Sequence, residues 1–267
     1  MKNYIVPLFA FLLLATSCNE FNKVLKSTDY DYKYEYAKKC YENKKFYRGY
    51  TLLEELVPIY KGTDKAEESL YLMGQCYFGS KDYSTAAQTF TTYYNTYPKG
   101  EFTELARFYS AKSYYLDSPD PRLDQSQNYR AINEVQMFLE YFPQSEKAKE
   151  AQDIMFELQE KLAYKELLNA RLYFNLGNYM GNNYLSCTIV SQNAIKNYPF
   201  SKYKEEFAFL ILKAKYEQAV NSIAEKKAER FRDVADEVYS YKNEFPEGKF
   251  MKEAGKMLDE AQKNVKN

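Results

Sequence analysis

The side chains that could support acid–base or metal chemistry are mainly carboxylates, because the 267-residue chain contains no histidine. Its absence removes the commonest general base and the commonest metal ligand. Three pairs of adjacent glutamates occur, namely Glu54 with Glu55, Glu67 with Glu68, and Glu205 with Glu206. Adjacent residues of a helix point to different faces, so the members of a pair cannot act together. We expect surface charges here, and the sequence predicts a protein that is not an enzyme.

Cysteine is the other reactive residue type, and three of the four cysteines lie within the predicted fold. Cys40, Cys76 and Cys187 form no CxxC motif. Cys76 lies within a helical pattern, and Cys187 occupies a position that favours a small residue. We therefore predict three buried thiols that act as small apolar residues, with no metal ion or cofactor. An oxidising compartment would permit a bridge, which the spacing neither requires nor excludes.

Cys18 ends an N-terminal targeting segment. Lys2 gives the segment a positive start, an apolar run of about eleven residues follows, and three small residues precede the cysteine. The run is too short to span a bilayer, which needs about 20 residues. The pattern resembles a bacterial lipoprotein signal, in which the cysteine thiol receives a diacylglyceryl group. We expect residues 1–17 to be a signal peptide and Cys18 to carry a covalent lipid. An ordinary secretory signal with a chance cysteine is the alternative.

Residues 18–28 are predicted to be a lipidated tether with a reach of about 35 Å. Asn19 follows Cys18 where many Gram-negative lipoproteins retained at the inner membrane have aspartate. By that resemblance, the sequence indicates an outer-membrane protein anchored by its lipid, with its folded part in the periplasm. The chain has 37 basic and 37 acidic residues. This balance gives no electrostatic footprint for nucleic acid.

An all-α fold is predicted from the helical spacing of apolar residues and the low content of glycine and proline. Residues 70–98 match the sparse signature of a tetratricopeptide repeat. The matching residues are Leu70, Met73, Gly74, Tyr77, Ala86, Phe90 and Pro98. Small residues let two antiparallel helices approach closely, and the proline ends the second helix. Parts of the pattern recur 37 positions upstream and downstream, which predicts a solenoid of about five helix pairs.

Aromatic–proline pairs mark the ends of four repeats, at Tyr97-Pro98, Phe142-Pro143, Tyr198-Pro199 and Phe245-Pro246. They predict an N-terminal half with repeats 1–3 at residues 29–145. A second half at 146–267 would hold a long linking helix, repeats 4–5 and a C-terminal capping helix. Residues 117–125 contain two prolines and three aspartates and are predicted to be an inserted loop. This loop is either a contact site or tolerated surface.

The lipoprotein signal, the short tether and the five repeats together resemble the BamD family of outer-membrane assembly lipoproteins. The segments that carry the resemblance are Cys18, residues 74–98, residues 170–179, Tyr198-Pro199 and residues 222–231. The resemblance implies a periplasm-facing scaffold of the β-barrel assembly machinery. Such a subunit binds the periplasmic domains of a BamA-type barrel protein. It also receives unfolded outer-membrane proteins for folding and insertion.

Two rows of aromatic residues recur at a pitch of 37 residues in repeats 1–3. The first row consists of Tyr34, Tyr71 and Phe108, and the second of Tyr41, Phe78 and Tyr115. Residues seven apart share one helix face, and the first helices of such repeats line a concave groove. We therefore expect two aromatic ladders there, which would suit the extended, aromatic-rich clients that the resemblance implies. The alternative is that these rings pack between neighbouring helices.

A basic cluster in the C-terminal half is the candidate docking patch for the barrel subunit. Its members are Lys226, Lys227, Arg230 and Arg232. The alternative for this patch is an ordinary solvated face.

Two other function classes stay open. The chain could scaffold another envelope complex, in division or cell-wall synthesis, because repeats alone do not name their partner. It could also be a nutrient-binding surface lipoprotein whose aromatic rings stack on sugars. The complete absence of tryptophan disfavours this last class.

Overall fold

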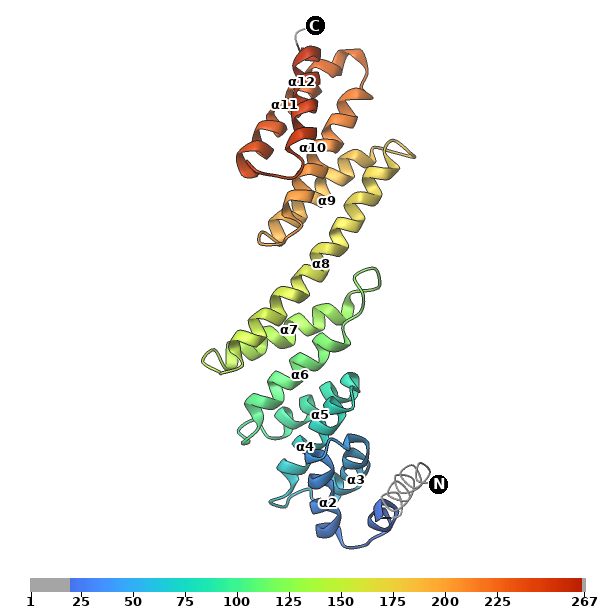
Figure 1. Cartoon of the computed structure of the whole chain (residues 1–267), viewed down its shortest axis with the longest axis vertical. Coiled ribbons are helices and arrows are strands. Elements are labelled where there is room, and N and C mark those ends of the chain that lie inside the picture. The colour runs from blue at the N-terminus through green and yellow to red at the C-terminus, as the bar shows by residue number, and fades with distance from the viewer. Residues whose placement is uncertain (1–19, 266–267) are drawn as a thin grey trace, which may run out of the picture. The chain divides into compact units, whose positions relative to one another are not determined.

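The computed structural model describes residues 20–265, and every regular element among them is an α-helix (Figure 1). Cys18 and the predicted signal peptide lie outside the described residues. The helices, in chain order, are α2 (Tyr30–Glu42), α3 (Phe46–Ile59), α4 (Ala66–Gly79), α5 (Tyr83–Thr96), α6 (Thr103–Asp117), α7 (Ser126–Tyr141), α8 (Ala148–Leu176), α9 (Asn183–Asn197), α10 (Lys204–Val220), α11 (Ala224–Glu244) and α12 (Met251–Val265). Within residues 20–265, none of the helices has the length and apolar character that crossing a membrane requires.

These helices form five consecutive pairs, from α2–α3 to α10–α11, followed by the single helix α12. We number the pairs repeats 1 to 5, so that the linking helix α8 is the first helix of repeat 4. This order confirms the predicted fold of a helical-repeat solenoid with a linking helix and a capping helix. The linking helix α8 has 29 residues, in a stretch without glycine or proline. The capping helix α12 buries one stripe, Ala254, Leu258 and Ala261, at the i, i+4, i+7 spacing of an amphipathic helix.

The aromatic–proline sites end the second helix of four pairs. Thus α5, α7, α9 and α11 each stop at the residue before the aromatic member of the pair, because proline and the residue before it disfavour further helix. Three of the helices, α2, α5 and α9, begin with a polar cap. Asp29, Asp82 and Asn182 accept hydrogen bonds from backbone N–H groups three residues later, at 2.9–3.2 Å.

The chain forms two compact units. Unit 1 comprises the described residues up to Ser118 and residues 126–155, and unit 2 comprises residues 119–125 and the described residues from Phe156 onward. The division falls within α8, whereas the predicted boundary at 145/146 lies before that helix. Residues 119–125 come from the predicted insert, so part of this loop belongs to unit 2.

Small residues permit close helix approach in unit 1. A Cβ atom on Gly74 would lie 2.7 Å from the ring of Phe90, and one on Gly49 would lie 2.7 Å from Cys76 Sγ. Either substitution would force the buried neighbour to move, which overpacked cores resist. The small–large pairing expected from the repeat signature therefore holds α4 against α5 and α3 against α4.

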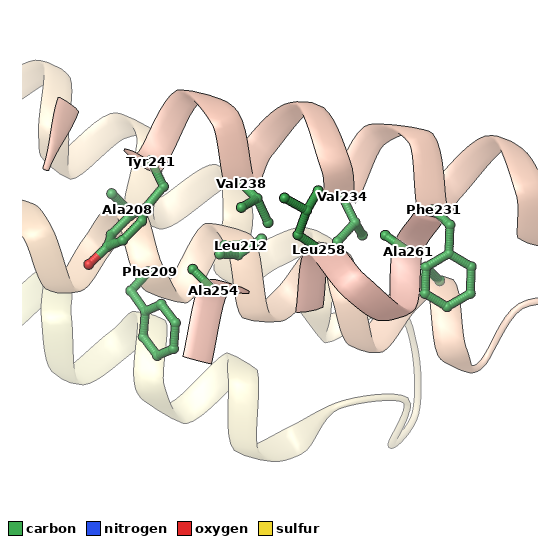
Figure 2. Packing of buried hydrophobic residues seen from close by; sticks show 11 residues of the cluster. Ala208, Phe209, Leu212, Phe231, Val234, Val238, Tyr241, Ala254, Leu258 and Ala261 are labelled. Carbon is green, nitrogen blue, oxygen red and sulfur yellow. The ribbon is translucent and has the colours of Figure 1, made fainter. Parts of the chain in front are cut away.

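The core of unit 2 around α10, α11 and α12 is shown in Figure 2. Val234 and Val238 of α11 lie opposite Leu212 of α10 and Leu258 of α12, and these side chains are almost completely buried. Burial of a Val or Leu side chain contributes about 1.5–3 kcal/mol. This cluster fixes the last repeat and its capping helix to each other.

The described part of the predicted tether does not extend freely. Residues 20–25 are helical, and Val24 is completely buried against the unit 1 core. Phe21 stacks on Tyr36 at 6.5 Å and lies under the guanidinium of Arg48 at 5.2 Å. The tether prediction is therefore corrected for this segment, because two apolar side chains at i and i+3 share one helix face and find a hydrophobic surface.

Cys40, Cys76 and Cys187 are buried thiols, as predicted. Burial raises the pKa of Cys76 to about 12 and the pKa of Cys187 to about 11, and it also raises the pKa of Cys40. A thiol with a raised pKa is a poor nucleophile at neutral pH. These residues therefore behave as small apolar side chains.

Candidate functional site

The first predicted aromatic row mostly packs between helices. Tyr34 and Phe108 are 2% and 1% exposed. The ring of Tyr34 meets that of Tyr60, the residue after α3, and the ring of Phe108 meets that of Phe138 in α7, each at 5.5 Å. Tyr71 is half-buried and stacks on Phe102 at 4.5 Å. The structure therefore corrects the expectation of an exposed row for Tyr34 and Phe108, because large rings at these positions fill the space within and between pairs.

The second row lies nearer the surface. Tyr41, Phe78 and Tyr115 are all half-buried. Across the turn between α2 and α3, Tyr41 packs on Phe46 at 6.1 Å. Across the turn between α4 and α5, Phe78 packs on Tyr83 at 5.6 Å. These three side chains keep part of their surface available to a ligand.

The structure adds Tyr109 to these residues, and the sequence reading missed it. Its half-buried ring lies 5.1 Å from Phe78. Burial raises the pKa of Tyr71 and of Tyr41, and in both cases Tyr109 raises it further. The rings of Tyr71 and Tyr109 both lie against that of Phe90, at 5.8 and 5.6 Å, and the electrostatic effect of Tyr109 on Tyr41 adds α2 to the same group. We call Tyr41, Tyr71, Phe78 and Tyr109 the aromatic cluster.

Tyr109 escaped the sequence reading because it lies one residue out of the 37-residue register. Phe108, which keeps the register, turns toward α7 instead. A second polar residue also belongs to the site, since Gln75 Nε2 donates to Tyr71 Oη at 2.8 Å. An aromatic cluster with neutral hydroxyls and an amide can stack on side chains and exchange hydrogen bonds with an extended peptide.

The four residues of the predicted basic patch differ in their surroundings. Arg230 Nη1 donates to Ser222 Oγ at 2.7 Å and to the backbone oxygen of Gln218 at 3.2 Å. It therefore satisfies the C-terminus of α10, where carbonyl groups lack helical partners. Arg232 is exposed and borders a pocket with Gln262 of α12. Lys226 is exposed, and Lys227 is half-buried.

The adjacent glutamates are not simple surface charges. The first member of each pair accepts a hydrogen bond from a buried tyrosine, and the second pairs with a cation. The tyrosine bonds are Tyr77–Glu54, Tyr93–Glu67 and Tyr241–Glu205. The ion pairs are Lys33–Glu55, Lys38–Glu68 and Arg171–Glu206. The expectation of surface charges holds for Glu54 and Glu55, which are exposed, and is corrected for the other four glutamates, which are half-buried. A buried phenol needs an acceptor, and the first glutamate of each pair supplies it.

The turns after α5, α7, α9 and α11 share one backbone geometry. The residue two positions after the proline donates its N–H to the carbonyl of the aromatic residue before that proline, at 2.9–3.1 Å. The residues that donate are Gly100, Ser145, Ser201 and Gly248. In three of these repeats, a glutamate near the start of the first helix of the pair lies beside the turn that follows the second helix. We call these four places the repeat turns.

Repeats 2 and 5 have the same side chains at their repeat turns. Tyr241 Oη donates to Glu205 Oε1 at 2.7 Å, and Tyr93 donates to Glu67 in the same way. A Cβ atom on Gly248 would lie 2.7 Å from both Tyr241 Oη and Glu205 Oε1. Glycine is therefore required where the tyrosine occupies this space.

Repeat 3 replaces both residues. Phe138 stands five positions before Pro143, where repeats 2 and 5 have tyrosine, and Ser145 stands where they have glycine. Ser145 Oγ now donates to Glu104 Oε1 at 2.6 Å. The carboxylate keeps a hydroxyl partner although the tyrosine is absent, because the missing phenol leaves room for the serine side chain.

The described residues include no group of three or more cysteine, aspartate or glutamate side chains that could hold a metal ion. The aromatic cluster and the repeat turns present aromatic surface, phenols and carboxylates. This chemistry is suited to recognising polypeptide.

Comparison with known proteins identifies the family. The family model described as YfiO, outer membrane lipoprotein, matches residues 27–184. This segment includes unit 1 apart from its first residues, the whole of the linking helix α8 and the first residues of α9. No curated protein matches the chain. Because the matched segment covers more than half of the 267 residues, the chain belongs to the YfiO family of outer membrane lipoproteins.

Proposed function

We propose that the chain is a non-enzymatic, lipid-anchored scaffold of outer-membrane β-barrel assembly, comparable to BamD, and that it faces the periplasm. In this proposal, unit 1 binds extended segments of unfolded outer-membrane proteins at the aromatic cluster. The observation that carries the proposal is the packing of the half-buried rings of Tyr71, Phe78 and Tyr109 around Phe90 in a member of an outer membrane lipoprotein family. Aromatic residues with hydroxyl groups favour peptide recognition.

A BamA-type barrel protein is the proposed second partner. Unit 2 is its proposed docking region, and Lys226 and Arg232 are the members of the predicted basic cluster that are exposed. Purification of the full, lipidated chain in mild detergent tests this partner. A large β-barrel protein with periplasmic domains, recovered in near-stoichiometric amount, would support it. Recovery of cell-wall or division enzymes instead would contradict it and favour the other envelope scaffold.

Peptide binding at the aromatic cluster can be tested with a synthetic peptide that has aromatic residues at alternate positions. We expect Tyr41→Ala to weaken binding by about tenfold, because truncation of an aromatic anchor removes more than 1 kcal/mol. Tyr71→Ala should act in the same direction and also disturb the stack on Phe102. Fluorescence anisotropy of the labelled peptide measures both effects.

Tyr239→Ala is the matched control, since this tyrosine of unit 2 is 49% exposed and far along the chain from the cluster. Its affinity should equal that of the unaltered protein. If Tyr41→Ala retains full affinity while its circular dichroism stays unchanged, the cluster is not the peptide site.

A further inference from the structure

Repeat 4 contains a carboxylate that lacks the partner of its counterparts. Glu160 of α8 lies four residues before Tyr164, whose ring meets Tyr203 at 5.3 Å. Glu67 of repeat 2 and Glu205 of repeat 5 likewise lie four residues before an aromatic residue whose ring stacks on another, in the pairs Tyr71–Phe102 and Phe209–Phe250. The side chain of Glu160 is only 11% exposed. No donor among the described residues reaches Glu160 Oε2, which is shielded from solvent.

The sequence of repeat 4 explains the missing partner. Ala194 stands five positions before Pro199, where repeats 2 and 5 have tyrosine. Ser201 could replace it, as Ser145 does in repeat 3. Its Oγ accepts from the backbone N–H of Tyr203 at 3.2 Å, just as Ser145 Oγ accepts from that of Lys147 at 3.0 Å, but it makes no hydrogen bond to Glu160 Oε2. The nearest cation is Lys202, whose Nζ lies 3.9 Å from Glu160 Oε2 and whose side chain is 68% exposed. Such a pair is too long for a hydrogen bond.

Glu160 borders a surface pocket of about 390 Å³ within unit 2. Three aromatic rings, those of Phe156, Tyr164 and Tyr203, line it together with Lys161 and Lys202. Phe156 is 47% exposed although it is a large apolar residue. A buried carboxyl oxygen without a donor, next to exposed aromatic surface, costs stability unless a ligand supplies the missing hydrogen bond.

The charges around the pocket decide which kind of donor fits. The carboxylates of Glu157 and Glu160 are balanced by the ammonium groups of Lys161 and Lys202, all of which line the pocket. A cationic ligand would approach two ammonium groups, which disfavours it. A neutral hydroxyl on an aromatic ring meets no such repulsion and can use the ring surface.

We propose that this pocket binds a tyrosine side chain of an extended partner polypeptide, whose hydroxyl donates to Glu160 Oε2. The proposal rests on a comparison inside the molecule. In repeats 2 and 5 the equivalent carboxylates receive the hydroxyls of Tyr93 and Tyr241 from their own chain. In repeat 4 the partner polypeptide supplies the same group. This site is separate from the aromatic cluster, so it stands whether or not that cluster binds clients.

The test uses the full chain and two synthetic peptides of glycine and serine, one with a central tyrosine and one with a central phenylalanine. Affinities are obtained by NMR titration. We expect the tyrosine peptide to bind about tenfold more tightly, as a hydrogen bond to a charged group implies. Glu160→Met should abolish this preference. Glu157→Met, the same substitution on the rim of the same pocket, should preserve it.

Three results would overturn the proposal. The first is equal binding of the two peptides to the unaltered protein, or no binding of either, and this result does not depend on any variant folding. The second is a tyrosine preference that survives in Glu160→Met. The third is binding of maltooligosaccharide at the resonances of Tyr164 and Tyr203 without binding of the tyrosine peptide, which would assign the pocket to sugars.

Discussion

Repeat 2 and repeat 4 solve the same local problem differently. Both place a glutamate near an aromatic contact, Tyr71 with Phe102 in one case and Tyr164 with Tyr203 in the other. In repeat 2 a buried tyrosine of the second helix completes the arrangement, and in repeat 4 an alanine stands in its place. The comparison shows that a repeat can keep its backbone turn while it exchanges an internal hydrogen bond for an open acceptor.

The largest difference should appear when each glutamate is replaced by methionine. Glu67→Met leaves the hydroxyl of Tyr93 and the backbone N–H of Glu101 without their acceptor, so we expect the free energy of unfolding to fall by about 2–3 kcal/mol. Glu160→Met is the matched control and removes no hydrogen bond at Oε2. It should leave the unfolding free energy unchanged or raise it. Urea denaturation measures both, and equal losses would contradict the comparison.

A smaller effect is expected from removal of a single hydroxyl in repeat 5. Tyr241→Phe deletes the donor to Glu205 while the ring remains, and the loss should be about 1.5 kcal/mol, as for a hydrogen bond to a charged group. Tyr239→Phe, two residues away and half-exposed, should change the unfolding free energy by less than about 0.5 kcal/mol. Similar losses in both variants would show that the bond to Glu205 is not special.

The smallest expected effect is the coupling free energy between two substitutions that give the turn of repeat 2 the side chains of repeat 3. Gly100→Ser alone places a Cβ atom 2.8 Å from Tyr93 Oη and against Glu67 Oε1. When Tyr93→Phe is added, the serine gains room and can donate to Glu67, as Ser145 donates to Glu104. The loss of unfolding free energy in the double variant should therefore be about 1 kcal/mol smaller than the sum of the losses in the two single variants. Additive losses in this double-mutant cycle would refute the exchange of tyrosine–glycine for phenylalanine–serine.

The fold was largely predictable because its signals are local and repeated. Aromatic–proline pairs mark helix ends wherever they occur, and Gly74 opposite Phe90 illustrates how the repeat spacing encodes packing. The long helix α8 follows from the absence of glycine and proline over its length. The position of Phe21 and Val24 on the core was not predictable from the same reasoning, since a single helical turn carries no period.

The candidate sites were less predictable, because they depend on which way a side chain turns. Phe108 and Tyr109 are adjacent, and only the packing of α6 on α7 decides that Phe108 turns inward. The partners of Glu67 and Glu205 lie 26 and 36 residues away along the chain. A signal for them did exist, since tyrosine five positions before proline accompanies glycine two positions after it in repeats 2 and 5.

Unit 2 is not continuous in the sequence, because residues 119–125 belong to it although they precede α7. Lys165 Nζ holds this segment by the backbone oxygens of Arg122 and Leu123, at 3.3 and 3.2 Å. During synthesis, the segment leaves the ribosome about 40 residues before the lysine that secures it. A fragment that starts at Phe156 would lack a piece of its own unit. The heptapeptide of residues 119–125, added to that fragment as a separate chain, should restore the stability that the truncation removes.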